Sequence, residues 1–378
     1  MTRREVLCAA AVAALGMGQA SDRGDDLPGL IEPIRARHDL PALAAATIVN
    51  GRPAQAAAVG VRKYGDATPV AVTDRFHLGS CTKAMTAALI GMLVEEGKLS
   101  WDARLPDVLP SVADAIHADL RSVTVDHLLA HRSGLSPQLH PRPSLPALIE
   151  GRKNPEAQRR DRLAFIERAL RNKPDTEPGK TYAYCNVGYM ILGAIAELAM
   201  DAPWEILMRR RIFGPLGITT GGFGAMGSPG KVDEPWQHRI RDGKPVPVEP
   251  GAFSDNPPEL GPAGTAHVSV GDWAKFLAAV ATGERQGGKL LKPATWKRLL
   301  TPQFGGNYAG GWIVTERAWA GRALTHAGSN TMNFCVAWLA PDKGFGVGVM
   351  TNIAGEKAPK GCDETAAAVI GRVLGAGS

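Results

Sequence analysis

The 378-residue chain has few aromatic residues, few cysteines and no strong excess of charge of either sign. Aromatic residues make up 6% of it, and five cysteines are present. Lysine and arginine number 43 against 37 acidic residues, a formal net charge of +6. The basic residues are scattered, whereas a nucleic-acid-binding face gathers them into a dense stripe, so we expect no nucleic-acid partner. There is no low-complexity tract and no internal repeat, which excludes repeat architectures.

The cysteines also match no metal-binding pattern. Beyond the first twenty residues their spacing fits neither a zinc site nor a c-type haem attachment; they are Cys81, Cys185, Cys335 and Cys362. Cys335 lies in an apolar, strand-like run and Cys362 precedes a C-terminal helix, positions typical of core or surface thiols. We therefore expect no metal and no cofactor.

The N-terminal apolar run is too short to span a bilayer. Residues 1–20 carry Arg3 and Arg4, then apolar residues from Val6 to Met17, then small residues. This is the layout of a secretory signal, and the paired arginines resemble a twin-arginine signal; a core helix is the alternative. We expect a periplasmic or secreted protein with no stable membrane anchor after signal removal.

Glycine (44) and proline (28) are plentiful, which predicts many turns. Asn50–Gly51 is a strong hairpin signal between two strands, and short apolar runs return near the C-terminus in "GGWIV", "RALTHAG", "NFCVAWLA" and "GFGVGVMTN". Residues 100 to 255 are mostly helical segments broken by proline-rich loops. Strands at both ends with helices between them predict an α/β (α+β) fold, in which both termini build one antiparallel sheet.

We therefore predict one discontinuous two-domain unit over residues 21–378. Residues 27–79 and 262–378 would form the sheet domain, and residues 80–261 an inserted, mostly helical domain.

The stretch "FHLGSCTKAM", residues 76–85, places a serine, a cysteine and a lysine within one helical turn. Apolar residues at helical spacing predict a helix over 80–96, so Ser80 and Lys83, at i and i+3, share one face. Backbone N–H groups at a helix N-terminus favour developing negative charge. A serine attacks well only when a base takes its proton. Lys83 can do so only if it is neutral, and lowering its pKa from about 10.4 toward 7–8 costs roughly 4 kcal/mol. Burial or a second cation must supply that shift.

Ser-x-x-Lys is a weak pattern on its own. It recurs at Ser228–Lys231 in "GSPGK", where glycine and proline disfavour a helix. For Ser80–Lys83 the simpler interpretation is an N-capped helix with a solvated lysine. Cys81 is a rival nucleophile, but no histidine partner can be placed for it.

The surrounding sequence resembles the serine β-lactamase and penicillin-binding-protein superfamily in its class C-like branch. The resemblance begins at "FHLGSCTK" and "LVEEGKLSWDARLPDVLP" and continues in family order from about residue 27 to 355. Its further blocks are "VTVDHLLAHRSGLS", "EPGKTYAYCNVGYMILGAIAE", "RIFGPLGITTGGFG", "GPAGTAHVSVGDWAKFL", "YAGGWIV" and "THAGSN".

The resemblance implies a role for each matching residue. Ser80 would be the acylated nucleophile, Lys83 its partner and Tyr184 a proton shuttle. Lys83 and Tyr184 should titrate jointly, and which of them takes the Ser80 proton stays open. Backbone N–H groups of Ser80 and Ser329 would form the oxyanion hole. The remaining substrate-binding positions would be Asn186, His326, Gly328 and Gln138.

Three features depart from the family pattern or compete with it. "SDN" at Ser254–Asp255–Asn256 spells a second-motif rival to Tyr184, but it runs into two prolines. His326 stands where many members carry lysine, which weakens the grip on a substrate carboxylate and suits esters, amides or D-amino-acid peptides at least as well as β-lactams. Cys185 lies beside Tyr184 and Cys81 beside Ser80, so a Cys81–Cys185 disulfide is chemically allowed in an exported protein; the alternative is two small buried thiols.

We accordingly expect an exported serine hydrolase that acts on a small-molecule or peptide substrate through an acyl-enzyme. Carboxypeptidase, esterase and β-lactamase activities are not separated by the sequence. The alternative is a catalytically weak or inactive relative that binds peptidoglycan-type ligands. The oligomeric state stays open.

Overall fold

The computed structural model describes residues 26–375; the predicted signal segment, residues 1–20, lies outside them. The central feature is a seven-stranded antiparallel sheet with the order β2-β1-β12-β11-β10-β9-β8. Its strands are β1 (Ala42–Val49), β2 (Arg52–Gly60), β8 (Tyr308–Ala309), β9 (Trp312–Arg317), β10 (Gly321–Ser329), β11 (Phe334–Ala340) and β12 (Phe345–Thr351). The N-terminal hairpin therefore pairs with the C-terminal strands, which confirms the predicted sheet built from both ends of the chain.

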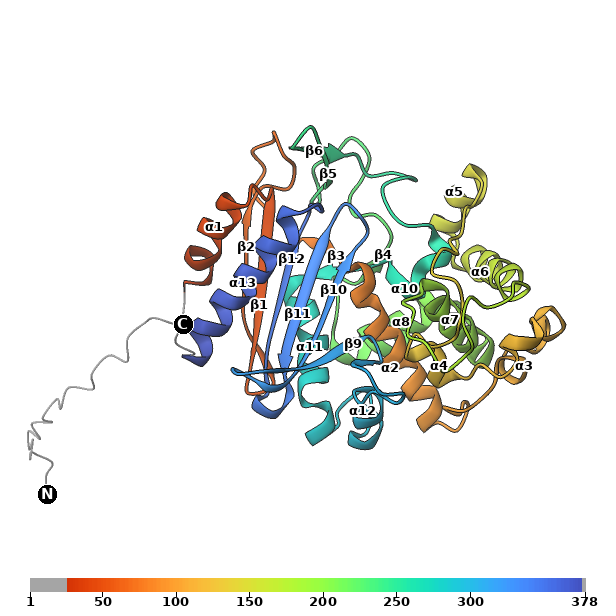
Figure 1. Ribbon diagram of the computed structural model, residues 1–378. Helices are drawn as coiled ribbons and strands as arrows, with labels where there is room; N and C mark the ends of the chain where they lie inside the picture. Colours follow the sequence, from red (N-terminus) through yellow and green to blue (C-terminus); the bar gives the residue numbers. More distant parts are fainter. Residues whose placement is uncertain (1–25, 376–378) are drawn as a thin grey trace, which may run out of the picture.

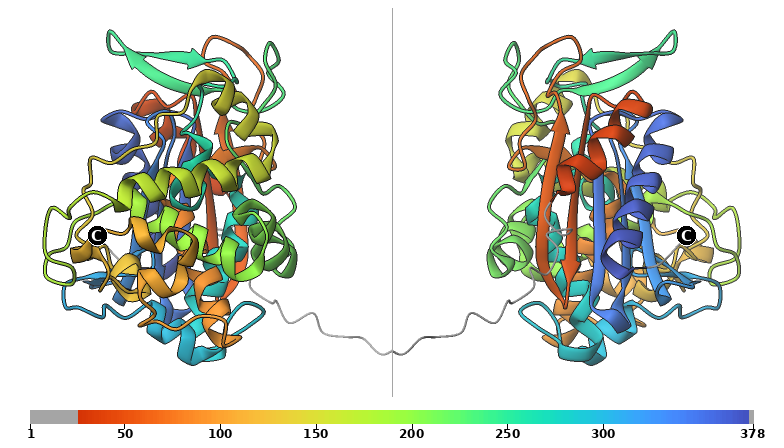
Figure 2. Two further views of the ribbon diagram at one scale, coloured as in Figure 1. Left: turned by 90° about the vertical axis from the view of Figure 1, so that its right-hand side faces the viewer. Right: turned by 90° about the vertical axis from the view of Figure 1, so that its left-hand side faces the viewer.

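Helices cover both faces of this sheet (Figure 1). One face carries α1 (Leu27–Arg37) and α13 (Lys357–Leu374), which lie side by side in the right-hand view of Figure 2. The opposite face packs against α11 (Val270–Gln286). The sequence of β1 explains this two-sided burial, because successive side chains of a strand point to opposite faces. Leu43 and Ala45 join the core under α1 and α13, whereas Ala44, Ala46 and Ile48 join the core on the other side.

Local sequence accounts for the tight features of the sheet. Asn50 and Gly51 both have positive φ, +51° and +74°, as the predicted two-residue hairpin requires. A Cβ on Gly348 of β12 would lie 2.9 Å from side-chain atoms of Leu277 and Trp273 in α11. Glycine at this position therefore lets α11 approach the sheet closely.

The middle of the chain is mostly helical and packs beside the sheet, at the right of Figure 1. Its main helices are α2 (Thr82–Glu95), α4 (Val125–Leu129), α5 (Leu145–Lys153), α6 (Pro155–Leu170), α7 (Asn186–Met200) and α8 (Trp204–Met208). The region also holds a short strand, β4 (Gly222–Phe223), and a hairpin of β5 (Gln237–Arg241) and β6 (Lys244–Val248). Neither was predicted from the sequence, which indicated mostly helical segments here. None of the helices within residues 26–375 has the length and apolar character needed to cross a membrane.

A small second sheet carries the chain into the predicted nucleophile. β3 (Arg75–His77) pairs with β7 (Ala266–Ser269), which also pairs with β4. A 3₁₀ turn, Gly79–Cys81, follows β3 and leads directly into α2. The end of β10 packs against this turn, so the segment around Ser80 lies where the large sheet meets the helical region.

Candidate active site

The structure brings Ser80 and Lys83 together at the start of α2. Ser80 lies in the 3₁₀ turn and is partly exposed, whereas Lys83 in the first turn of α2 is fully buried. Lys83 Nζ lies 3.1 Å from Ser80 Oγ. The helix therefore starts at Thr82, two residues later than predicted, and the lysine is not the solvated side chain of the simpler interpretation.

Lys83 Nζ has two further oxygen partners: it donates to Asn186 Oδ1 at 2.8 Å and to the Ala263 carbonyl at 2.7 Å. Burial lowers the pKa of Lys83 to about 7, although nearby Cys81 and Cys185 oppose that shift. A neutral amine has two N–H donors and one lone pair. The two carbonyl oxygens take both donors, which leaves the lone pair to accept the Ser80 proton.

Tyr184 lies in the loop that precedes α7. Its hydroxyl is buried and has no hydrogen-bond partner among the described residues. Burial raises the pKa of Tyr184, and the nearby Ser80 hydroxyl offsets only part of that effect. The phenol is therefore protonated at neutral pH, and Lys83 is the better acceptor for the Ser80 proton.

His131 holds Tyr184 in place, a function that the sequence analysis missed. Its carbonyl accepts from Ala183 N at 2.9 Å, and its Nδ1 accepts from Cys185 N at 3.2 Å. The two amides that flank Tyr184 thus bind one residue, and the His131 and Tyr184 ring centroids are 4.3 Å apart. His131 has a φ of +55°, unusual for a residue with a Cβ. Such local strain is typical of functional sites.

Gly328 and Ser329 end β10 directly against the nucleophile turn. A Cβ on Gly328 would lie 2.0 Å from the Leu78 carbonyl, and one on Gly79, whose φ is +46°, would lie 2.3 Å from Ser329 N. Only glycine at both positions lets the two backbones approach this closely. The approach places the Ser329 backbone next to the residue that precedes Ser80, as an oxyanion hole shared between them requires.

His326 lies on β10 and is buried. Its Nε2 is 3.3 Å from the hydroxyl of Tyr308, while its Nδ1 is buried with no partner among the described residues. Tyr308 was not singled out from the sequence, although it opens the "YAGGWIV" block. An imidazole ring, already engaged by a phenol, thus occupies the position at which the family resemblance led us to weigh a lysine.

Gln138 is the sequence-predicted site residue with the weakest structural support. Its side chain is exposed, and its backbone N–H donates to Ser136 Oγ at 3.4 Å. Its loop does reach the site, because the Cys185 thiol donates to the Ser136 carbonyl at 3.4 Å.

The structure has buried thiols and no Cys81–Cys185 disulfide, since all four cysteines among residues 26–375 are free and buried. The side chain of Cys81 points toward the sheet, where its Sγ lies 3.6 Å from Sγ of Cys335 on β11 and 3.5 Å from the His326 carbonyl. Adjacent residues in the 3₁₀ turn point in different directions, so Ser80 faces Lys83 whereas Cys81 faces Cys335.

The two rival motifs lie apart from the Lys83 contacts. Ser228 and Lys231 are connected by a backbone turn outside any helix. Ser254 Oγ binds only the backbone of Gly251, whereas Asp255 lies behind the nucleophile turn, 2.9 Å from His77 Nε2.

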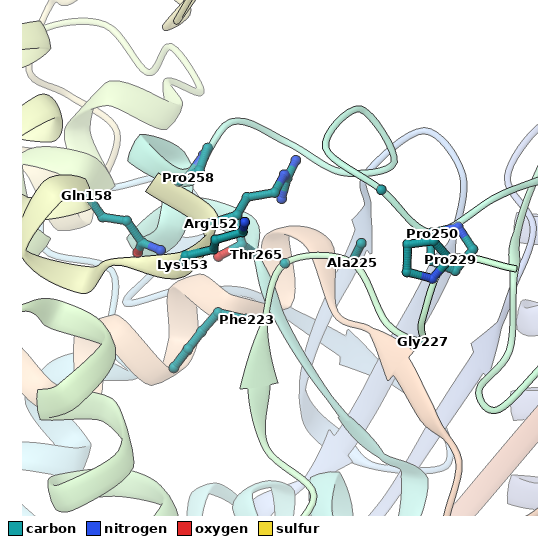
Figure 3. A pocket seen from close by; sticks show the side chains of 12 residues that line it. Arg152, Lys153, Gln158, Phe223, Ala225, Gly227, Pro229, Pro250, Pro258 and Thr265 are labelled. Atoms are coloured by element: carbon teal, nitrogen blue, oxygen red, sulfur yellow. The ribbon is translucent and has the colours of Figure 1, made fainter. Parts of the chain in front are cut away.

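No group of three or more His, Cys, Asp or Glu side chains within residues 26–375 could hold a metal ion. A cavity of about 360 Å³ opens between α5, α6 and the loops after β4 and β6 (Figure 3). Arg152, Phe223 and Thr265 line it, and none of the predicted site residues does.

Comparison with known proteins shows what this arrangement resembles. The sequence model of the family described as beta-lactamase matches residues 27–371. Penicillin-binding protein 4 of Amycolatopsis lactamdurans is 28% identical over 343 residues, which cover 85% of this chain and 83% of that protein. An unguisins hydrolase of Aspergillus campestris is 24% identical over 300 residues, 76% of this chain and 53% of that protein. A β-lactamase of Providencia stuartii is 26% identical over 199 residues, 51% of this chain and 45% of that protein.

The fold has a close counterpart among solved structures. The octameric penicillin-binding protein homologue from Pyrococcus abyssi superposes with a TM-score of 0.73 at 24% identity, covering 92% of this chain and 77% of that one.

Proposed function

The chain belongs to the beta-lactamase family of serine hydrolases, and we propose that it cleaves a peptide amide or an ester through an acyl-enzyme formed on Ser80. The observation that carries the proposal is the buried amine of Lys83, which lies 3.1 Å from Ser80 Oγ with its pKa lowered to about 7. A base with a pKa near the working pH is the most effective proton acceptor.

Acylation follows from these positions. Neutral Lys83 takes the Ser80 proton while Oγ attacks the substrate carbonyl carbon, and the carbonyl oxygen becomes an oxyanion that accepts from the backbone N–H groups of Ser80 and Ser329. The bond to the leaving nitrogen or oxygen then breaks. The Tyr184 hydroxyl donates its proton to that atom, and the Lys83 ammonium reprotonates Tyr184, so the proton taken from Ser80 departs with the leaving group. Water attacks the ester of Ser80 in the second half-reaction and regenerates the hydroxyl.

His326 supports an amide or ester substrate in preference to a β-lactam. Its ring, bound to Tyr308, offers a hydrogen bond through Nδ1 where a lysine ammonium would offer a full charge for a substrate carboxylate. A relative named for the hydrolysis of unguisins supports a substrate other than a β-lactam. We propose a D-amino-acid peptide or a related ester as the substrate class.

Intact mass spectrometry tests the nucleophile. The protein is exposed to a fluorophosphonate, to benzylpenicillin and to a p-nitrophenyl ester, and we expect one adduct or turnover that Ser80→Ala abolishes. Ser228→Ala is the matched control, because it removes the serine of the other Ser-x-x-Lys pair and should leave labelling intact. If wild type reacts with none of the three reagents, the proposal is wrong. Rapid ester turnover with no stable penicillin adduct supports the substrate class, and penicillin hydrolysis faster than ester hydrolysis contradicts it.

Export is a further proposal, supported by the composition of residues 1–20 alone. The full chain, expressed with a C-terminal tag in a bacterium with a twin-arginine pathway, should appear shortened in the periplasmic fraction. Replacing Arg3 and Arg4 together with lysine should retain it in the cytoplasm, and export unaffected by that change would refute the twin-arginine route.

A further inference from the structure

Asp255 lies behind the site and makes no hydrogen bond to Lys83 or Tyr184, yet its side chain is completely buried. A buried carboxylate is costly unless several groups bind it. Its Oδ1 lies 2.9 Å from His77 Nε2 and accepts from Asn330 Nδ2 at 3.0 Å. These two partners come from segments that are far apart in sequence.

The first partner leads to the nucleophile. His77 ends β3, and its Nδ1 accepts from the backbone N–H of Gly79 at 2.9 Å. Its Nε2 lies 2.9 Å from Asp255 Oδ1 in a close polar contact that is not one of the hydrogen bonds of the structure. The imidazole, whose side chain is also fully buried, therefore lies between the carboxylate and the residue immediately before Ser80.

The second partner leads to the other side of the oxyanion hole. Asn330 directly follows Ser329, and its Oδ1 accepts from Met332 N at 3.2 Å and Asn333 N at 2.9 Å. The Ser329 hydroxyl joins the same turn by donating to the Asn333 carbonyl at 2.7 Å. Asn330 thus shapes the turn that follows Ser329.

Asp255 is itself fixed from the helical region. Arg152 of α5 donates through Nη2 to the Asp255 carbonyl at 3.1 Å and through Nε to the Ala252 carbonyl at 2.8 Å. Arg152 also lines the cavity of Figure 3, and so do Gly251 and Pro258 of the loop that bears Asp255.

We propose that Asp255 is a positioning residue that sets the spacing of the two oxyanion-hole amides, through His77 on the Ser80 side and through Asn330 on the Ser329 side. This inference rests on the proposed Ser80 chemistry. An oxyanion hole stabilises the transition state more than the ground state. Loosening it therefore lowers kcat and weakens a tetrahedral adduct, while KM and the ability to bind substrate change little.

The test compares Asp255→Ala, Asp255→Asn and Ser254→Ala. Ser254 is the matched control, because it lies in the same loop and is also buried, but its hydroxyl binds only the backbone of Gly251. Fluorophosphonate titration counts active sites in each preparation, so kcat for p-nitrophenyl butyrate is expressed per competent site. Inhibition by phenylboronic acid, which forms a tetrahedral adduct on the serine, reports on the oxyanion hole.

We expect Asp255→Ala to lose about 10²-fold in kcat per titrated site, with a parallel loss in boronic acid affinity and a KM within about twofold of wild type. Asp255→Asn keeps an oxygen in place and should recover most of the loss, and Ser254→Ala should match wild type. If Asp255→Ala does not fold, His77→Ala and Asn330→Ala each remove one connection, and each should show the same kcat-specific loss.

Wild-type kcat in these variants, or a loss confined to KM with unchanged boronic acid affinity, would overturn the inference. A wild-type protein that neither labels nor turns over would instead refute the proposed function, so the two failures are distinguishable.

Discussion

The most demanding prediction concerns the buried amine of Lys83, because both the activity and the stability of the protein should depend on its protonation. The reference pKa of 10.5 falls to about 7 in the folded protein because of burial. That difference means that the charged, ammonium form of buried Lys83 lowers the free energy of unfolding by about 5 kcal/mol at low pH. Since the folded-state pKa is the lower one, the unfolded chain binds more protons between pH 7 and 10.5. Stability contributed by this group therefore rises with pH across that window and is flat below it.

The comparison of wild type with Lys83→Met isolates this effect. Other titrating groups contribute almost equally to both proteins and cancel. We expect the unfolding free energy of wild type, relative to the variant, to rise by about 1.4 kcal/mol per pH unit between pH 7.5 and 9.5. Urea denaturation at fixed temperature, followed by circular dichroism, measures it.

Activity should follow the same titration. kcat/KM for a p-nitrophenyl ester should fall about tenfold per unit as pH drops below 7, because only the neutral amine accepts the Ser80 proton. Lys83→Arg, which stays charged at every pH, should lose about 10³-fold throughout. A relative stability that does not change between pH 7.5 and 9.5 would refute the neutral-lysine argument. So would full activity retained at pH 5.

Three shorter predictions concern neighbouring residues. Tyr184→Phe removes a hydroxyl that has no hydrogen-bond partner, so kcat should fall by about 10²-fold while thermal unfolding stays within a few degrees; unchanged kcat would exclude a proton-donor role. Gly328→Ala places a Cβ 2.0 Å from the Leu78 carbonyl and should abolish fluorophosphonate labelling, whereas Gly271→Ala, with open space around its Cβ, should retain it. Cys81→Ala should keep Ser80-dependent labelling in intact mass spectra; loss of the adduct from a folded variant would restore the thiol as the nucleophile.

The fold was largely predictable because its signals are local or periodic. Asn50–Gly51 predicted the hairpin from its left-handed backbone requirement alone, and short apolar runs at both ends of the chain predicted the strands of one sheet. The β5–β6 hairpin was missed because its strands carry arginine, lysine and proline, and mostly lie at the surface. Their pairing is set by the turn between them and by the His238 contact to the Asn352 carbonyl, not by a hydrophobic pattern.

The contacts behind the site were not predictable for a different reason. Ser80 and Lys83 are three residues apart, so helix geometry alone brings them together. Asp255, His77 and Asn330 are separated by 75 residues or more, and only the tertiary fold brings them to one oxygen atom. From the sequence, "SDN" is only a rival catalytic motif. In the structure, its aspartate lies behind the site and contacts both His77 and Asn330.

The site contains buried polar atoms without hydrogen-bond partners in residues 26–375, and a bound substrate would supply those partners. The Tyr184 hydroxyl and His326 Nδ1 are both buried without partners among the described residues. Each such group costs about 1–3 kcal/mol in the free protein, and the buried Lys83 amine adds its own cost. Other buried polar atoms away from Ser80, such as Thr176 Oγ1 and Trp204 Nε1, also lack a partner among the described residues, so the position of the Tyr184 and His326 atoms beside Ser80 is what matters. A substrate carbonyl and leaving group bound next to Ser80 would supply the missing partners. The destabilising features therefore lie where substrate binding relieves them, and replacing them should stabilise the fold at the expense of turnover.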